Sequence, residues 1–182
     1  MAVLIEGYSI IINKQKALQN QNALEVLGAV EGTLHPTAIC SDQDLLRIGF
    51  VDLAQAKEFL AALEGAGLKQ GKEMVVVSQF GETETPNDWL KIQFTKLKDN
   101  TLVCIASLQS VDVINGVAMP KGWQLDISLL KRYFEERTSY MHEYYDLLRE
   151  EPMHDIYRHK ETGNEVRLLK LVFKPLEETQ IQ

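Results

Sequence analysis

Residues 45–64 read LLRIGFVDLAQAKEFLAALE, and this stretch carries the clearest structural signal in the chain. Its first part, 45–51, is an apolar run typical of a strand. Asp52 follows as a helix N-cap, with Gln55 three residues further on in a capping-box arrangement that satisfies two backbone amide donors. Beyond it, apolar residues recur at helical spacing until the glycines within 65–67. We expect a strand followed directly by an amphipathic helix.

Three more strands are expected after this helix. Met74 to Val77 is a run of apolar residues, and residues 89–97 alternate between apolar and polar side chains. A turn at 98–100 separates them from a last apolar run at 101–108, and this arrangement predicts a hairpin. Residues 45–108 therefore read β-α-β-β-β.

The chain before this region predicts a strand, a helix and a short edge strand. Residues 2–12, AVLIEGYSIII, are rich in β-branched and aromatic side chains, so we expect a single strand with Gly7 as a bulge. Residues 15–29 are rich in Ala, Leu and Gln and predict a helix. A loop follows, and its apolar piece at 38–40 predicts an edge strand.

The C-terminal third predicts a loop, one long helix and a hairpin. Residues 111–125 contain Gly and Pro and are expected to link two parts of the chain. Asp126 is the expected cap of a helix that runs to about Arg149 and stops before a proline. Strands at 156–160 and 166–173 flank a turn. The expected division is a sheet domain at 1–110, the linker at 111–125, a helix and hairpin extension at 126–176, and a frayed tail at 177–182.

The order of elements predicts an α+β fold, and it resembles a known module. In order and length, residues 45–108 resemble the βαβββ module of the vicinal-oxygen-chelate superfamily, which includes glyoxalase and bleomycin-resistance proteins. With the preceding strand and helix, the order fits a ferredoxin-like sheet with helices on one face equally well. The segments VLIEGYSIII, LLRIGFV and PNDWLKI also resemble an uncharacterised family of bacterial proteins, which implies no activity.

Composition narrows the range of functions. The formal net charge of -7 leaves no basic stripe to bind nucleic acid over an extended surface. No apolar run approaches the roughly 20 residues of a membrane span, and Glu6 interrupts the N-terminal apolar run that a signal peptide would need. Cys40 and Cys104 have no CxxC spacing, so we expect reduced thiols and a cytoplasmic protein.

Catalytic patterns are weak throughout the sequence. The vicinal-oxygen-chelate resemblance implies His or Glu metal ligands on the sheet, but its strands offer polar side chains of other kinds, so we expect no metal and no cofactor. His142 and Asp146 share a face of the predicted helix without a third ligand. His154 and His159 would point to opposite faces of a strand. No GxSxG motif is present, and a buried or idle thiol is favoured over a reactive thiolate at Cys40.

The polar face of the predicted sheet is the first candidate site. Alternation places Trp89, Lys91 and Gln93 on the face away from the helix, and Glu6 and Tyr8 share one face of the first strand. If these faces coincide, they form a concave surface for a small polar ligand or a peptide. The candidate ligand-binding residues are Glu6, Tyr8, Arg47, Trp89, Lys91 and Gln93.

The long helix is the second candidate site. Five of the six tyrosines lie within residues 133–157, and tyrosine is enriched at protein interfaces. The alternative is that these aromatic residues pack within the chain. The candidate interface residues are Phe134, Tyr140, Met141 and Tyr144, and a homodimer is the simplest partner.

These observations favour a non-enzymatic binding or protein-interaction protein, with the helix and hairpin as docking elements. The alternative is a small-molecule-binding or catalytic protein of the vicinal-oxygen-chelate type that uses the polar face of the sheet.

Overall fold

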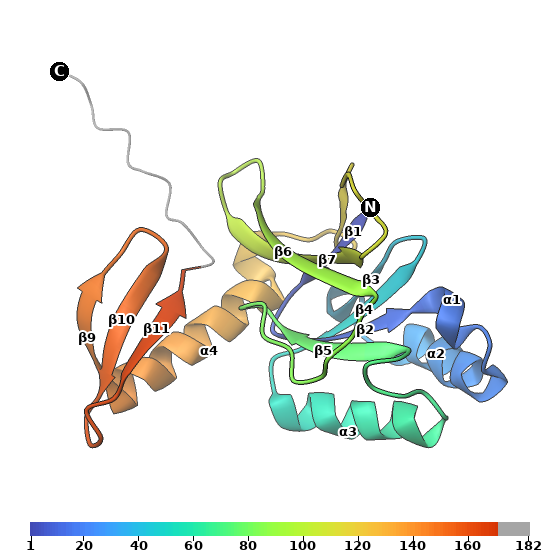
Figure 1. Cartoon of the computed structure of the whole chain (residues 1–182), viewed down its shortest axis with the longest axis horizontal. Coiled ribbons are helices and arrows are strands. Elements are labelled where there is room, and N and C mark those ends of the chain that lie inside the picture. Colours follow the sequence, from blue (N-terminus) through green and yellow to red (C-terminus); the bar gives the residue numbers. More distant parts are fainter. Residues whose placement is uncertain (171–182) are drawn as a thin grey trace.

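The computed structural model describes residues 1–170, and these residues form an α+β fold, as predicted. Two four-stranded sheets, A and B, are stacked, and a three-stranded sheet C lies to one side at the end of helix α4 (Figure 1). Sheet A has the order β6 (Leu90–Lys96), β7 (Leu102–Leu108), β1 (Ala2–Ile5) and β8 (Val117–Ala118). Sheet B has the order β3 (Ile39–Ser41), β4 (Leu45–Phe50), β2 (Tyr8–Asn13) and β5 (Met74–Ser78).

The apolar segment at the start of the chain forms two strands in different sheets. Val3 pairs with Ala106 in sheet A, whereas Ile10 pairs with Ile48 in sheet B. Between them Gly7 has φ +58°, and a Cβ at this position would collide with a backbone carbonyl of β4. The prediction of one strand over 2–12 with a bulge is therefore wrong, because the chain passes from one sheet to the other at Gly7.

Strand β2 is apolar on both faces because it is covered on both faces. Ile11 points toward sheet A and packs with Val3 and Ile5 of β1. Ile10 and Ile12 point the other way, into a second apolar core. This double burial explains why the sequence shows no polar alternation here.

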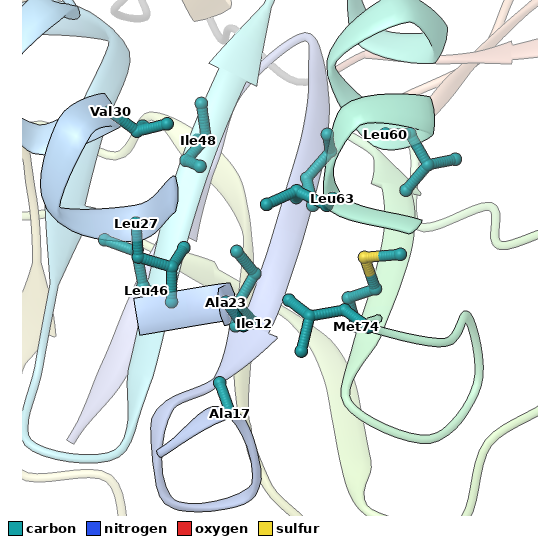
Figure 2. Close-up of a cluster of buried hydrophobic side chains, with 12 residues drawn as sticks. Ile12, Ala17, Ala23, Leu27, Val30, Leu46, Ile48, Leu60, Leu63 and Met74 are labelled. Atoms are coloured by element: carbon teal, nitrogen blue, oxygen red, sulfur yellow. The ribbon is translucent and has the colours of Figure 1, made fainter. Parts of the chain in front are cut away.

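The second core is formed by helices α2 (Gln21–Thr33) and α3 (Leu53–Gly65), which cover the outer face of sheet B (Figure 2). Helix α3 begins as predicted, because the Asp52 side chain accepts a hydrogen bond from the Ala54 N–H at 2.8 Å. We call sheets A and B with these two helices the layered body.

The helix predicted over 15–29 is interrupted. A single turn, α1 (Lys14–Ala17), is followed by a break, and α2 then begins after Asn20. The Asn20 side chain accepts from the Ala23 N–H at 3.2 Å and so caps the new helix. The predicted edge strand is present as β3.

The predicted order of strands and helix over 45–108 is present as β4, α3, β5, β6 and β7. Strands β6 and β7 form the predicted hairpin, with Leu90 opposite Leu108. The five elements are divided between the sheets: β4 and β5 flank β2 in sheet B, and β6 and β7 belong to sheet A.

The segment predicted as a linker lies against the outer face of sheet A. Strand β8 pairs in parallel with β1, and Met119 and Trp123 pack against an apolar cluster that includes Leu4 and Ile105. The division of the chain into domains stays a prediction, but this stretch contributes to the core.

The helix in this region is shorter than the predicted 126–149, and its N-cap is a different residue from the one predicted. Helix α4 spans Leu129–Tyr144, and its N-cap is Ser128, whose hydroxyl accepts from the Lys131 N–H at 3.1 Å. Asp126 lies in a short 3-10 turn before it. Residues predicted as the last helical turns form strand β9 (Tyr145–Glu150), because they pair with the next strand.

Sheet C has the order β11, β10 and β9, so the predicted terminal hairpin is present and gains a third strand. Strand β10 spans His154–His159 and β11 spans Glu165–Leu169. Residues 171–173 of the predicted last strand, and the predicted tail at 177–182, lie outside the described residues.

Candidate functional site

Two of the predicted ligand-binding residues form a buried ion pair. Glu6 follows β1 and Arg47 lies in β4, and both side chains are 0% exposed. The Arg47 Nη2 donates to Glu6 Oε2 at 2.8 Å. The second oxygen, Glu6 Oε1, accepts from the Trp123 indole N–H at 2.8 Å and from the Leu130 backbone N–H at 3.2 Å. The carboxylate thus joins both sheets to the segment that enters α4.

Gln79 extends this arrangement, and we call Glu6, Arg47, Gln79 and Trp123 the buried polar network. The Gln79 carbonyl oxygen accepts from the Gly7 N–H at 2.8 Å, and its amide donates to the Leu130 carbonyl at 3.2 Å. Arg47 Nε has no hydrogen-bond partner among the described residues. Every other group of the network is satisfied by the protein itself, which is typical of a structural cluster.

The remaining predicted ligand-binding residues lie elsewhere. Trp89 is buried and donates its indole N–H to the Gly71 carbonyl at 3.0 Å. Lys91 and Gln93 are half-buried on β6 in sheet A. Tyr8 is half-buried and meets Tyr133 of α4 edge-on, with ring centroids 5.0 Å apart. The structure therefore brings Glu6 to Arg47 but does not gather the six residues on one exposed surface.

The turn at Gly7 is the reason for this dispersal. Glu6 and Tyr8 share a face only if the strand continues between them, and the strand ends at Ile5. Arg47 belongs to sheet B, whereas Lys91 belongs to sheet A. The sequence marked Gly7 as a bulge, and nothing nearby indicated that the chain changes sheets there.

Two cavities share the lining residues Tyr8 and Leu53. The first has a volume of about 540 Å³, between the N-terminus of α3 and the side of α4, and its charged and aromatic lining includes Asp52, Arg132, Tyr133, Glu136, Arg137 and Tyr140. The second, of about 370 Å³, lies between α3 and β5. Leu60 and Val76 contribute to its apolar wall, and Glu64, Glu82 and Glu84 lie among its lining residues. Sequence reasoning did not single out these charged residues.

Burial changes the pKa of one tyrosine beside the first cavity and of both cysteines. Burial raises the pKa of Tyr133, and the neighbouring Tyr8 adds to the effect. Burial also raises the pKa of the Cys40 thiol, and it raises that of Cys104 to about 12. Both cysteines are therefore thiols rather than nucleophilic thiolates at neutral pH.

The histidines do not converge on a metal site. His142 lies on α4 but Asp146 lies on β9, so the shared helical face predicted for them does not exist. His159 accepts two backbone N–H bonds and meets the Tyr145 ring edge-on at 4.8 Å. Within residues 1–170, no group of three or more His, Cys, Asp or Glu side chains is arranged to hold a metal ion.

The predicted interface residues lie on α4 in two environments. Met141 is buried in a small core with Tyr157 and Leu168 of sheet C. Tyr140 and Tyr144 are 49% and 43% exposed, and their rings lie 4.8 Å apart. Phe134 is half-buried.

Strand β9 continues this exposed apolar character and was missed by the sequence reasoning. Leu147 and Leu148 are 41% and 37% exposed. We call Tyr140, Tyr144, Leu147 and Leu148 the α4–β9 surface. Strand β9 is also an edge of sheet C, and the described residues place no strand on its outer side.

Comparisons with known proteins add no functional information. No protein family, no curated protein and no solved structure matches the chain. Among the described residues, no helix is both long enough and apolar enough to cross a membrane.

Proposed function

We propose that this chain is a non-enzymatic protein-interaction protein and that it docks its partner through the α4–β9 surface. The observation that carries the proposal is the exposure of four large apolar or aromatic side chains within nine residues, beside a strand edge that no strand of residues 1–170 covers. Tyrosine combines a large contact area with a polar tip, and exposed strand edges bind further strands through their backbone groups.

The position of the surface supports the proposal. Helix α4 leads away from the layered body, and β9 lies on the side of sheet C that faces away from that body (Figure 1). A partner can reach β9 without displacing any described element. Met141, Tyr157 and Leu168 form a small core beneath the surface, so it rests on a defined scaffold.

Site-specific photo-crosslinking tests the proposal. A photoreactive phenylalanine analogue at position 144 or 148, in the cells that make the protein, should form a defined crosslink to one protein. Leu24 on α2 is the matched control, because it is 38% exposed. Helix α2 lies at the end of the layered body that is farther from sheet C (Figure 1). Crosslinks at 144 and 148 that are absent at 24 support the proposal. Absence at all three positions, or equal crosslinking at 24, contradicts it.

A second candidate function is small-molecule binding, as the vicinal-oxygen-chelate resemblance implies. The cavity of about 370 Å³ between α3 and β5 favours it, because an apolar wall with a few polar groups is typical of ligand sites. A thermal-shift screen with divalent metals and small metabolites tests this function. A ligand at about 100 times its Kd adds roughly 2.7 kcal/mol of stability. Replacing Leu60 with Trp, which fills the cavity, should abolish a genuine shift.

A further inference from the structure

Strand β9 contains one extra residue, and this residue changes which side chains share a face. Asp146 lies opposite Arg158 and Arg149 lies opposite Ile156, with a bulge at Leu148 between them. Arg158 and Ile156 are two residues apart on β10 and so point to the same face of sheet C. Asp146 and Arg149 therefore also share a face, although they are three residues apart. By the same pairing, Tyr145 and Glu150 share the other face.

The backbone bonds at the two ends of β9 show which groups point outward. The Lys160 N–H donates to the Tyr144 carbonyl at 3.0 Å, and the Glu151 N–H donates to the His154 carbonyl at 2.7 Å. Hydrogen-bonded and non-hydrogen-bonded positions alternate along an antiparallel pair. The N–H and C=O of Tyr145 and Glu150 consequently point away from β10, toward the open edge of the sheet.

The outer edge of β9 is complementary to itself. If two copies of β9 run antiparallel with Tyr145 opposite Glu150, their outward backbone groups meet and form hydrogen bonds at both ends. The same register places Asp146 opposite Arg149, at a non-hydrogen-bonded position where side chains approach most closely. Leu147 then lies opposite Leu148 at the centre. Backbone direction permits this register, and side-chain charge favours it over the other registers that backbone direction permits.

We propose that the partner of the α4–β9 surface is a second copy of this chain, joined by antiparallel pairing of β9 with β9 across a two-fold axis. This inference rests on the proposed docking function. The axis is perpendicular to the sheet, so both copies of α4 lie on one face of a continuous six-stranded sheet. Charged residues and bulges at an edge usually prevent pairing with arbitrary strands. Here the charges exclude other strands but match those of a second copy.

Charge reversal tests the register. Sedimentation velocity over a concentration series should show reversible dimerisation of the full chain. Asp146→Arg and Arg149→Asp each place two like-charged pairs in the dimer and should weaken it about tenfold or more. The double variant restores opposite charges and should return to within about threefold of the wild type. Glu58→Arg and Lys57→Glu, which make the same charge changes on exposed positions of α3, should leave dimerisation unchanged.

A cysteine pair gives a second test, which can be read out even if the variant is less stable than the wild type. Asp146→Cys with Arg149→Cys should form intermolecular disulfides under mild oxidation, because opposed non-hydrogen-bonded residues lie about 4.5 Å apart. Asp146→Cys with Glu165→Cys, a pair on different strands, should not form them between copies.

The outcomes separate this inference from the proposed function. A chain that is monomeric at all concentrations, or whose double charge variant dimerises no better than the single variants, overturns β9 pairing. A photo-crosslink from position 148 to a different protein would then leave the docking function intact. A crosslink to a second copy, together with rescue by the double charge variant, supports both.

Discussion

Removing either member of the buried Glu6–Arg47 pair should strongly destabilise the fold. Both side chains are 0% exposed, and their charged atoms lie 2.8 Å apart. Removing one member of such a pair leaves an uncompensated charge and costs about 3–5 kcal/mol of unfolding free energy. We expect the cost of Arg47→Met to lie near the lower end of this range, because Glu6 retains hydrogen bonds from Trp123 and Leu130.

The two substitutions should not be equivalent. Glu6→Leu removes the carboxylate partner of the Arg47 guanidinium, which still donates to the Ala38 carbonyl at 3.3 Å, and it also removes the acceptor of two N–H groups. Each buried donor that loses its acceptor costs about 1–3 kcal/mol. Glu6→Leu should therefore cost about 5 kcal/mol or more. The double substitution removes both charges and should cost no more than Glu6→Leu alone.

Urea unfolding, followed by far-UV circular dichroism and fluorescence, measures these differences. The matched control is Arg158→Met, which breaks the Arg158–Glu165 pair at 3.0 Å, where both side chains are about half exposed. An exposed pair of this kind contributes less than about 1 kcal/mol. If Arg47→Met costs as little as Arg158→Met, or if the effects of the two network substitutions simply add, the reasoning is refuted.

Three further predictions follow from local environments. Gly7→Ala should lower the free energy of unfolding by more than the roughly 1 kcal/mol expected for Gly163→Ala. Both residues have positive φ, but of the two only Gly7 lies against backbone atoms. Chemical denaturation of the two variants measures the difference. The thiol of Cys104 should resist a thiol reagent at pH 8 until the protein unfolds. Its pKa of about 12 lies above the ordinary value of 9.0, so the unfolded state loses this proton first and stability should fall between pH 9 and about 12, less steeply in Cys104→Ala. Met141→Asp should lower stability by about 3 kcal/mol, whereas Tyr144→Asp should cost less than about 1 kcal/mol, as thermal unfolding would show; equal losses would contradict the burial difference between them.

Several elements could be predicted because their signals are local. The capping residue Asp52 and the apolar spacing after it define α3 within a few positions. The β6–β7 hairpin follows from alternation around a short turn. The terminal hairpin follows from two β-rich runs around Gly163. In each case neighbouring residues contain the information.

The errors occur where strand pairing, rather than the composition of the segment itself, decides the structure. Residues 2–12 read as one strand because every position is suited to a strand, and only pairing with β4 and β7 assigns the two halves to different sheets. Residues 145–150 contain Leu, Arg and Glu, which favour a helix, yet they pair with β10 and become β9.

The candidate sites show the same limit. Glu6 is a carboxylate within an apolar strand, and this pattern fits a ligand contact as well as a buried ion pair. The distinction depends on Arg47, 41 residues away, and on Trp123, 117 residues away. The proximity of Tyr140 and Tyr144 could be predicted, because residues four apart on a helix lie on the same face.

Because the chain passes from sheet A to sheet B at Gly7, the two sheets can form at different times during synthesis. Val3 pairs with Ala106 and Ala118, so β1 is synthesised more than 100 residues before its neighbours. At roughly 5–20 residues per second, this apolar strand waits about 5–20 s for them on the ribosome. Strand β2 finds β4 sooner, because Ile10 pairs with Ile48. Sheet B can therefore form while β1 is still exposed, and assembly of the newly made chain depends on shielding β1 until sheet A is complete.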